Sequence, residues 1–399
     1  MIIITDKKNC TGCHACFNIC PQHCITMESD REGFWYPVVD EKKCIQCGLC
    51  EKVCPVLHKE LVQNEPKAYA CMNKDEIIRL QSSSGGIFTL IAEHIIDKGG
   101  VVFGASFDKN FTVVHHHVDT KEKLSQLRGS KYVQSKIGDT YKQVKDFLIQ
   151  GRMVLFSGTP CQIEGLKSYL RKPYQNLFCV DIICHGVPSP KVWQKYISYR
   201  ENDVGSSIGK IFFRRKNEGW KRYSVSFLFK NNKEYIKTFD KDLYMQAFLK
   251  NICLRPSCYD CEFKTLHRKS DITLADFWGI QNVFPKMDDD KGTSLIFVNS
   301  NKGQIMLEKI KDYIICNEVD IHKAVSYNSS AIRSVQCNPK RDNFFHELDS
   351  YSFDQLVKKY CSDSLMLNIK KKVKSIIYVV LKKIGLLEVV KRILRKTRI

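Results

Sequence analysis

The first 60 residues contain the same cysteine spacing twice, and this repeat restricts the fold more than any other feature of the sequence. The first run consists of Cys10, Cys13, Cys16 and Cys20, and the second of Cys44, Cys47, Cys50 and Cys54. Each run reads C-x2-C-x2-C-x3-C and is followed by proline, a spacing that holds [4Fe-4S] clusters. Zinc sites and disulfides are the alternatives, but a four-ligand zinc site gives no reason for a duplicated run.

In this spacing the fourth cysteine of each run binds the cluster of the other run. We therefore expect one cluster on Cys10, Cys13, Cys16 and Cys54, and the other on Cys44, Cys47, Cys50 and Cys20. Residues 1–60 are predicted to form a small pseudo-symmetric α+β module, a two-[4Fe-4S] ferredoxin domain that its clusters hold together and that passes single electrons. Cys24 lies outside the runs, and we expect it to be a buried apolar residue rather than a ligand.

The composition indicates a folded chain. With 399 residues, of which 43% are hydrophobic and 11% aromatic, the chain can fill the cores of two or three domains, which excludes a disordered or collagen-like protein. No run of about 18 apolar residues predicts a transmembrane helix, and the start of the chain does not resemble a signal peptide. In the cytoplasmic protein that this predicts, 19 cysteines indicate metal ligation rather than disulfides.

After a polar linker at 61–68, the chain alternates between expected helices and strands. Ser82 to Gly86 precede apolar residues at helical spacing, and a strand is expected over 101–107. The Ser-Gly turn at the start of this helix would offer free N–H groups to an anion, and an ordinary helix cap is the alternative. His115 to His117 lie in a strand-like stretch whose alternate residues face opposite ways, which argues against one shared metal ion.

A second group of cysteines follows the ferredoxin-like runs. Cys161 and Cys184 come directly after two expected strands, near 153–156 and 177–183, where α/β folds bind ligands. Together with the C-x2-C pair of Cys258 and Cys261, they could hold a third cubane, and separate buried thiols with a zinc pair are the alternative. The isolated cysteines are expected to be packing residues: Cys71, Cys179, Cys316, Cys337 and Cys361.

Six motifs in a fixed order resemble the beta subunit family of coenzyme F-420 hydrogenase/dehydrogenase, whose relatives include 7-hydroxymethyl chlorophyll a reductase. They are QSSSGGIFT, RGSKYVQS, SGTPCQIEGL, CHGVPS, CYDC and DITLADFWG. The resemblance, over roughly residues 1–330, implies FAD with a third [4Fe-4S] cluster beside it, on Cys161, Cys184, Cys258 and Cys261. Cys253 is the residue that would replace one of these four. The chain departs from hydrogenase subunits at Asp276-Phe277-Trp278-Gly279, which leaves the use of coenzyme F-420 open.

The resemblance also implies a set of flavin contacts. These are Ser84, Gly85, Gly86, Gly129, Ser130, Lys131, Tyr132, Gly158, Thr159 and Pro160. His185, next to Cys184, is a candidate catalytic proton donor, and a structural loop histidine is the alternative. Arg214, Arg215 and Lys216 would hold an anionic substrate or form a solvated basic edge.

The C-terminal segment carries half of the net charge of +20. Residues 365–399 contain eleven Lys and Arg and one Glu, with apolar residues at helical spacing. This pattern predicts a basic amphipathic helix on the anionic inner face of the membrane. Docking on the protein's own core and a nucleic-acid arm are the alternatives, although no nucleic-acid motif accompanies the charge.

Together these features predict an α+β chain: a two-cluster ferredoxin module, a mixed α/β flavin- and iron–sulfur-binding domain, and a C-terminal amphipathic helix. Within the second domain we expect a flavin-binding part at 69–150 and a part with the third cluster and substrate face at 151–330, followed by a connecting segment at 331–364. The predicted function is an FAD-dependent iron–sulfur oxidoreductase that acts on a small organic substrate with a ferredoxin-like or other one-electron partner. A non-catalytic electron-transfer subunit and an iron–sulfur nucleic-acid protein are the alternatives.

Overall fold

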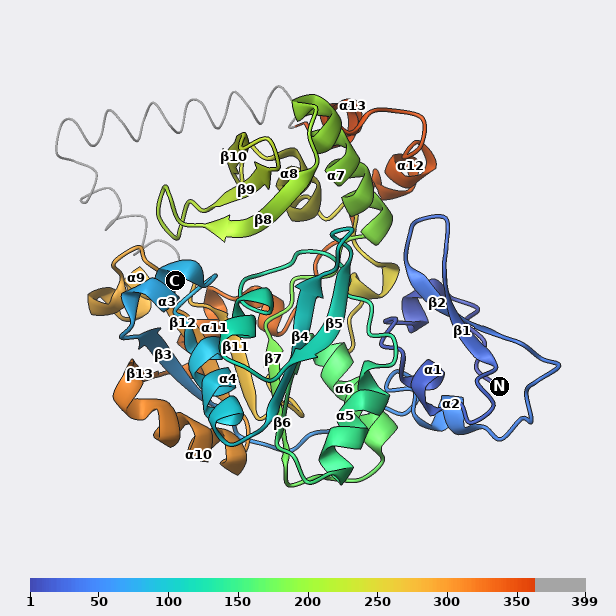
Figure 1. Ribbon diagram of the computed structural model, residues 1–399, viewed down its shortest axis with the longest axis horizontal. Helices are drawn as coiled ribbons and strands as arrows, with labels where there is room; N and C mark the ends of the chain where they lie inside the picture. Colours follow the sequence, from blue (N-terminus) through green and yellow to red (C-terminus); the bar gives the residue numbers. More distant parts are fainter. Residues whose placement is uncertain (363–399) are drawn as a thin grey trace.

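The structure is a computed structural model that describes residues 1–362, so the predicted amphipathic helix at 365–399 lies outside the described residues. The expected mixed α/β architecture with an N-terminal ferredoxin-like module is confirmed. Figure 1 shows this module beside a large central sheet, with a smaller sheet above.

The N-terminal module has two short helices and one hairpin. Its elements are α1 (Ala15–Ile19), β1 (Ile25–Ser29), β2 (Trp35–Val39) and α2 (Leu49–Lys52), and β1 pairs antiparallel with β2. Each helix begins after a residue in the left-handed region, His14 with φ 64° before α1 and Gly48 with φ 70° before α2. Each tight start places the third cysteine of its run, Cys16 or Cys50, on a helix directly after the first two.

The central sheet has eight strands in the order β13-β3-β12-β11-β7-β6-β4-β5. Their bounds are β3 (Lys67–Asn73), β4 (Val101–Phe107), β5 (Val113–Val118), β6 (Val154–Gly158), β7 (Leu177–Ile182), β11 (Ile272–Asp276), β12 (Ser294–Val298) and β13 (Ile314–Val319). Strands β5, β12 and β13 run antiparallel to their neighbours, so β3, β11, β7, β6 and β4 share one direction. The carboxyl ends of these five strands therefore meet at one edge of the sheet, the edge at which such folds bind ligands.

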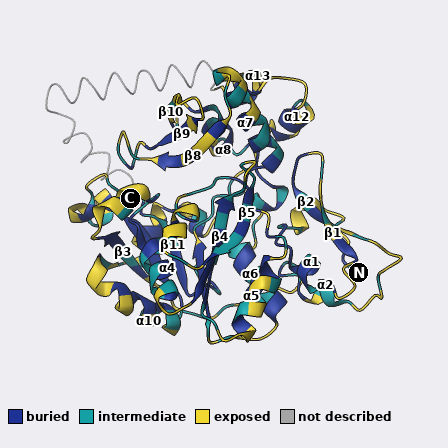
Figure 2. Ribbon diagram, in the orientation of Figure 1, coloured by how far each residue is buried: buried dark blue, intermediate teal, exposed yellow. Residues whose placement is uncertain are grey.

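Helices cover both faces of this sheet. α4 (Ile87–Asp97) and α10 (Asn301–Ile310) pack on one face, and α5 (Thr140–Ile149) and α6 (Pro160–Leu170) on the other. Neighbouring strand residues alternate between the two cores: Val102 packs on the α4 side and Val101 on the α5 side. Figure 2 shows the strands buried between these layers and the outer surface of α10 exposed. β3 also leads into the short α3 (Glu76–Gln81), and α9 (Ile280–Val283) and α11 (Ile321–Ser326) cover the β3–β12 end.

The smaller sheet was not anticipated from the sequence. It has the order β10-β9-β8, with β8 (Ile208–Arg215), β9 (Ser224–Phe229) and β10 (Glu234–Thr238). It packs against α7 (Pro190–Val204), α8 (Leu243–Leu249), α12 (Arg341–His346) and α13 (Phe353–Cys361). The same core includes Phe34 and Tyr36 of the N-terminal module, so the predicted linker separates segments that pack together. Strands from both predicted parts, 69–150 and 151–330, form the single central sheet.

Candidate iron–sulfur and flavin site

Two cavities in the N-terminal module are lined by the eight cysteines of the duplicated run. The first has about 360 Å³ of empty space and is lined by Cys10, Cys13, Cys16 and Cys54. The other has about 350 Å³ and is lined by Cys20, Cys44, Cys47 and Cys50. The structure thus brings the fourth cysteine of each run to the three thiols of the other run, which is the grouping that two cubanes require.

A third cavity lies at the carboxyl edge of the central sheet. It has about 470 Å³ of empty space and is lined by the second group of cysteines, Cys161, Cys184, Cys258 and Cys261. Cys161 is the second residue of α6, which begins after β6 with a capping box between Thr159 and Gln162. Cys184 follows β7, and Cys258 ends the short 3-10 helix Pro256–Cys258. Three separate elements therefore bring these thiols, spread over 100 residues, to one place.

The thiols of the third cavity are buried beside cationic side chains. Burial raises the pKa of Cys161 well above its usual range and that of Cys258 to about 12, so both thiols keep their protons until a metal displaces them. Lys264 and Arg268 also line the cavity. Arg268 is paired with buried Asp181 at 3.1 Å, whereas Lys264 donates to the backbone carbonyls of Cys184 and Ser330. The positive charge of Lys264 therefore lies beside the cysteines, which would have to be thiolates to bind a cluster.

These cavities suit clusters better than single ions. Within residues 1–362, no group of three or more His, Cys, Asp or Glu side chains is placed to hold one metal ion. The four cysteines of a cubane each bind a different iron, so their sulfurs surround the cluster instead of meeting at one point. His115 fits this result, because its imidazole contacts the Oγ of Ser135 and the carbonyl of Ser157 rather than its neighbours in the histidine run.

The first and third cavities are adjacent. Thr11 lines both of them. Gly165 of α6 also meets the N-terminal module directly, since a Cβ placed there would lie 2.9 Å from the Cβ of Cys13 and 3.0 Å from its Sγ. This contact brings the helix that carries Cys161 against the loop that carries Cys13.

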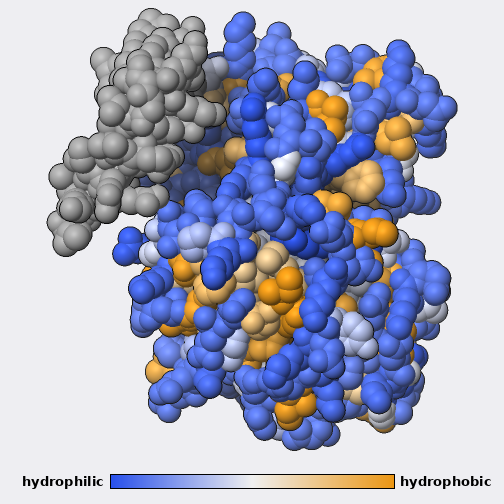
Figure 3. Space-filling view, turned by 90° about the vertical axis from the view of Figure 1, so that its left-hand side faces the viewer, coloured by the Kyte–Doolittle hydropathy of each residue, from blue (hydrophilic) through white to orange (hydrophobic). Residues whose placement is uncertain are grey.

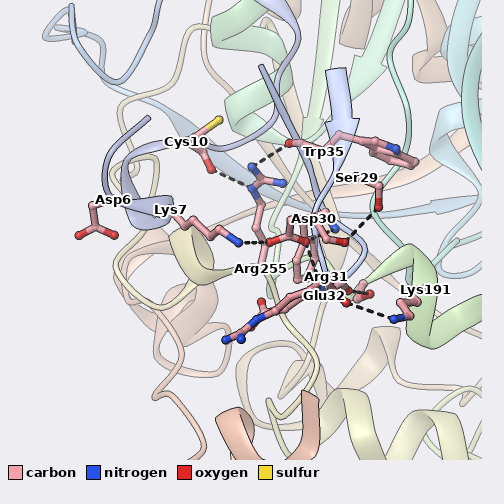
Figure 4. A network of polar contacts seen from close by, with 12 residues as sticks. Asp6, Lys7, Cys10, Ser29, Asp30, Arg31, Glu32, Trp35, Lys191 and Arg255 are labelled. Atoms are coloured by element: carbon pink, nitrogen blue, oxygen red, sulfur yellow. Dashed lines mark hydrogen bonds and ion pairs between the residues drawn. The ribbon is translucent and has the colours of Figure 1, made fainter. Parts of the chain in front are cut away.

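Arg255 joins the same two regions. Its buried guanidinium donates to the backbone carbonyls of Cys10 and Trp35, at 2.8 and 3.1 Å (Figure 4). It also contacts Gln134. Sequence reasoning assigned no role to Arg255, although its place three residues before Cys258 was a usable signal.

The remaining cysteines divide into three kinds. Cys253, Cys179 and Cys361 are buried in cores, and Cys253 does not line the third cavity. Cys24 is buried as expected, but it lines the second cavity, with its Sγ 3.3 Å from that of Cys20. Cys71 and Cys316 pack in the core next to α4 as expected, and their sulfurs also contact each other. The packing interpretation is wrong for Cys337, which is exposed.

Two of the stretches expected to contact flavin lie together. The backbone N–H and the hydroxyl of Ser130 both bond to the Oγ of Ser83, at 2.7 and 2.8 Å. The first turn of α4, which begins after Gly86, has no side-chain cap. Arg128 lies beside this turn, and its hydrogen bonds go to two neutral side chains, Thr89 and Gln81.

Local backbone conformation and packing favour glycine at both Gly85 and Gly86, independently of any bound ligand. Gly86 has φ 82°, and a Cβ there would meet the Cβ of Asn73 at 3.2 Å. A Cβ on Gly85 would lie 2.5 Å from the carbonyl oxygen of Cys71. Bulky replacements here would disturb packing, so they cannot report on a bound phosphate. The third stretch, Gly158 to Pro160, ends β6, and Thr159 and Pro160 line the third cavity.

Lys131 stabilises the loop of the second stretch. Its Nζ donates to the backbone carbonyls of Gln126, Arg128 and Gly129. Tyr132 contacts Phe248 and Phe213 and lies near Arg214. These contacts connect residues 129–132 to the smaller sheet.

His185 lines the third cavity but donates its Nε2–H to the Oδ1 of Asn251 at 2.7 Å. In that tautomer the Nδ1 atom carries no proton. Burial lowers the pKa of His185, which favours the neutral ring. The geometry therefore favours the alternative of a structural hydrogen bond.

The basic run after β8 is divided among three environments. Arg214 is buried and paired with Asp276 at 2.9 Å, Arg215 is paired with Glu234, and Lys216 donates to three backbone carbonyls. Phe277 lies in a core and cannot shape a substrate face. Trp278 stacks on Trp220 with ring centroids 4.9 Å apart, and the Nε1–H of Trp220 donates to Asp276.

Two family comparisons match the chain. Residues 9–57 match a 4Fe-4S dicluster domain, which, with the paired cavities, defines an iron–sulfur electron-transfer protein. Residues 151–323 match the C terminus of the beta subunit of coenzyme F420 hydrogenase/dehydrogenase. This is the family that the motifs of the sequence resemble, and the match places residues 151–323 in an oxidoreductase subunit family.

A solved structure is similar as well. The structure, a xenon derivative of the F420-reducing [NiFe] hydrogenase complex from Methanosarcina barkeri, contains a chain with 16% identity and a TM-score of 0.45. The similarity covers 67% of the present chain and 91% of that chain. No curated protein matches the sequence significantly.

Within residues 1–362, no helix is both long and apolar enough to span a bilayer, and Figure 3 shows a mainly hydrophilic face with small apolar patches.

Proposed function

We propose that the chain is an FAD-dependent oxidoreductase with three [4Fe-4S] clusters, the third held by Cys161, Cys184, Cys258 and Cys261. The observation that carries this proposal is the third cavity, in which four thiols from three elements meet beside Thr11 of the first cluster loop. Such an arrangement would place a one-electron carrier between the ferredoxin module and the ligand-binding edge of the sheet.

The FAD part of the proposal rests on the same edge. The uncapped start of α4 offers backbone N–H groups, and Arg128 supplies a nearby positive charge, which together suit the phosphates of a dinucleotide. When bound, FAD supplies two-electron exchange with an organic substrate and one-electron exchange with the clusters. The residues proposed to hold it are those of the stretches at 84–86, 129–132 and 158–160.

Metal and flavin analysis of anaerobically purified full-length protein tests the proposal. Three cubanes correspond to about twelve irons per chain, and one FAD should accompany them. The Cys258→Ser variant should lose about four irons, whereas Cys253→Ser should keep all twelve because Cys253 does not line the cavity. A wild-type protein with eight irons would refute the third cluster.

The flavin is tested by a separate variant. Arg128→Met should lower FAD content while iron stays at the wild-type level. Its matched control is Arg152→Met, because Arg152 also donates to neutral groups, the carbonyls of Gly99 and Gly100 before β4. Wild-type protein with twelve irons and no FAD would refute the flavin and leave the third cluster standing.

A second candidate is a non-catalytic electron-transfer subunit of a larger complex. The matched family is named for a beta subunit, which favours this candidate. The isolated chain would then hold clusters and reduce no small substrate, and a partner protein would co-purify with it. A turnover assay on the isolated chain with a one-electron donor separates the two candidates.

We propose an anionic membrane surface as the partner of residues 365–399, to be tested by vesicle sedimentation after deletion of this segment.

A further inference from the structure

Two cysteines far apart in the sequence face each other across the edge of the central sheet. Cys71 of β3 and Cys316 of β13 are directly paired in the antiparallel register, and their Sγ atoms lie 3.1 Å apart. β13 is the outermost strand at this end of the sheet, on the left in Figure 1. Cys71 is buried beneath it, and Cys316 is partly exposed.

The backbone geometry at this pair suits a disulfide. Directly opposed residues of antiparallel strands have Cα atoms about 4.5–5.5 Å apart. Disulfides span Cα separations of about 4.4–6.8 Å, so an S–S bond needs no movement of the strands. The thiol of Cys71 already donates its hydrogen toward the sulfur of Cys316.

The two thiols differ in the way that such a reaction requires. The hydrogen bond from Cys71 lowers the pKa of Cys316, which is also the more accessible sulfur. Burial raises the pKa of Cys71 and keeps it protonated until its partner has reacted. Neither residue lines any of the three cluster cavities.

We propose that Cys71 and Cys316 are a redox-modification site that forms a reversible disulfide with low-molecular-weight disulfides as the oxidant. The thiolate of Cys316 attacks one sulfur of the small disulfide, whose S–S bond breaks and releases one small thiol. Cys71 then attacks the sulfur of Cys316, which releases the second small thiol. Two protein thiols are oxidised, one small disulfide is reduced, and the two thiol protons end on the two released thiols.

The disulfide would fasten an edge strand that supports the ligand-binding edge. β3 ends at Asn73, whose backbone N–H donates to the carbonyl of Gly85 at 2.8 Å and whose side chain donates to that of Gly86 at 3.3 Å. Closing a loop from 71 to 316 also restricts the unfolded chain strongly, because stabilisation by a disulfide grows with loop length. The oxidised protein should therefore melt at a higher temperature than the reduced protein.

Disulfide mapping on the full-length holoprotein tests the proposal. The protein is incubated anaerobically with oxidised glutathione, its free thiols are alkylated during denaturation, and it is digested without reductant for mass spectrometry. A cross-linked peptide pair containing Cys71 and Cys316 is expected, which dithiothreitol should remove, with iron content unchanged and a melting temperature raised by several degrees.

Two variants give the controls. Cys316→Ser should abolish the cross-link and the rise in melting temperature, whereas the exposed-site variant Cys337→Ser should keep both. In the wild type, a glutathione adduct on Cys337 would show that the oxidant is active. Under that condition, each of three results would overturn the proposal. The first is an unmodified Cys316, and the second is a glutathione adduct on Cys316 without the cross-link. The third is a cross-link from Cys71 or Cys316 to a cluster cysteine, with loss of iron.

Discussion

Arg255 donates from Nε to the backbone carbonyl of Cys10 at 2.8 Å, across 245 positions of the sequence. Cys10 lines the first cavity, and Cys258, three residues after Arg255, lines the third. One guanidinium therefore fixes the position of one cysteine loop relative to the other. A rigid connection of this kind would hold the first cluster and the proposed third cluster at a fixed separation.

The Arg255→Met variant should unfold more easily. Without the guanidinium, the partly buried carbonyls of Cys10 and Trp35 lose a donor, and each unsatisfied group costs about 1–3 kcal/mol. We expect the free energy of unfolding to fall by roughly 2–5 kcal/mol in anaerobic urea titrations followed by cluster absorbance. Arg222→Met is the control, because this side chain is exposed and its ion pair with Glu218 is a surface i,i+4 pair. An unchanged urea midpoint in Arg255→Met would contradict the connection.

Gly165→Ala should disturb the contact between α6 and the first cluster loop. Alanine in a helix interior gains about 0.5–1 kcal/mol over glycine, but overpacking costs about 1–3 kcal/mol. Since the added Cβ would press on Cys13, the cost should win and iron should be lost from the N-terminal module. Iron analysis and urea titration measure both effects. Gly209→Ala is the control, because its Cβ would make only an ordinary contact at 3.4 Å, and equal iron content in the two variants would refute the prediction.

Asp276→Asn should leave a buried positive charge without its partner. Arg214 and Asp276 form a pair at 2.9 Å with side chains only 4% and 17% exposed. Breaking such a pair costs about 3–5 kcal/mol, whereas replacing both members with apolar residues is often nearly neutral. We expect the double variant Arg214→Met/Asp276→Leu to melt at a higher temperature than Asp276→Asn. The reverse order would show that the pair does not behave as a coupled unit.

His115 should make the protein less stable as the pH falls. Burial lowers the pKa of His115 from 6.5 to about 4, so between these values the unfolded chain binds a proton that the folded chain does not. Stability therefore falls as the pH falls through this window, by about 2 kcal/mol from pH 6.5 to 5. Glutamine does not titrate, so His115→Gln should lose about 2 kcal/mol less than wild type over the same range. Urea titrations at both pH values measure the difference, and the exposed-site control His322→Gln should match wild type.

Local patterns predicted much of the fold. The strand expected over 101–107 is β4 with the same bounds, and the helix after Gly86 is α4. Both elements could be predicted because their signals are local: apolar residues at regular spacing, and the Gly99-Gly100 pair that ends the helix. The smaller sheet was missed, since β8 and β10 are half-exposed without a strict alternating pattern and β9 is almost entirely buried, so none of the three shows a clear period of two.

The sequence alone determined that this chain carries a two-cluster iron–sulfur module, because ligand spacing within one loop is a local property that tertiary structure cannot change. Motifs that stand in order along the chain also predicted the family whose model residues 151–323 match. Only the tertiary structure decided which distant groups meet. Arg255 beneath Cys10, Gly165 against Cys13 and Cys71 opposite Cys316 all depend on the register of strands and the packing of helices hundreds of residues apart, which no local spacing records.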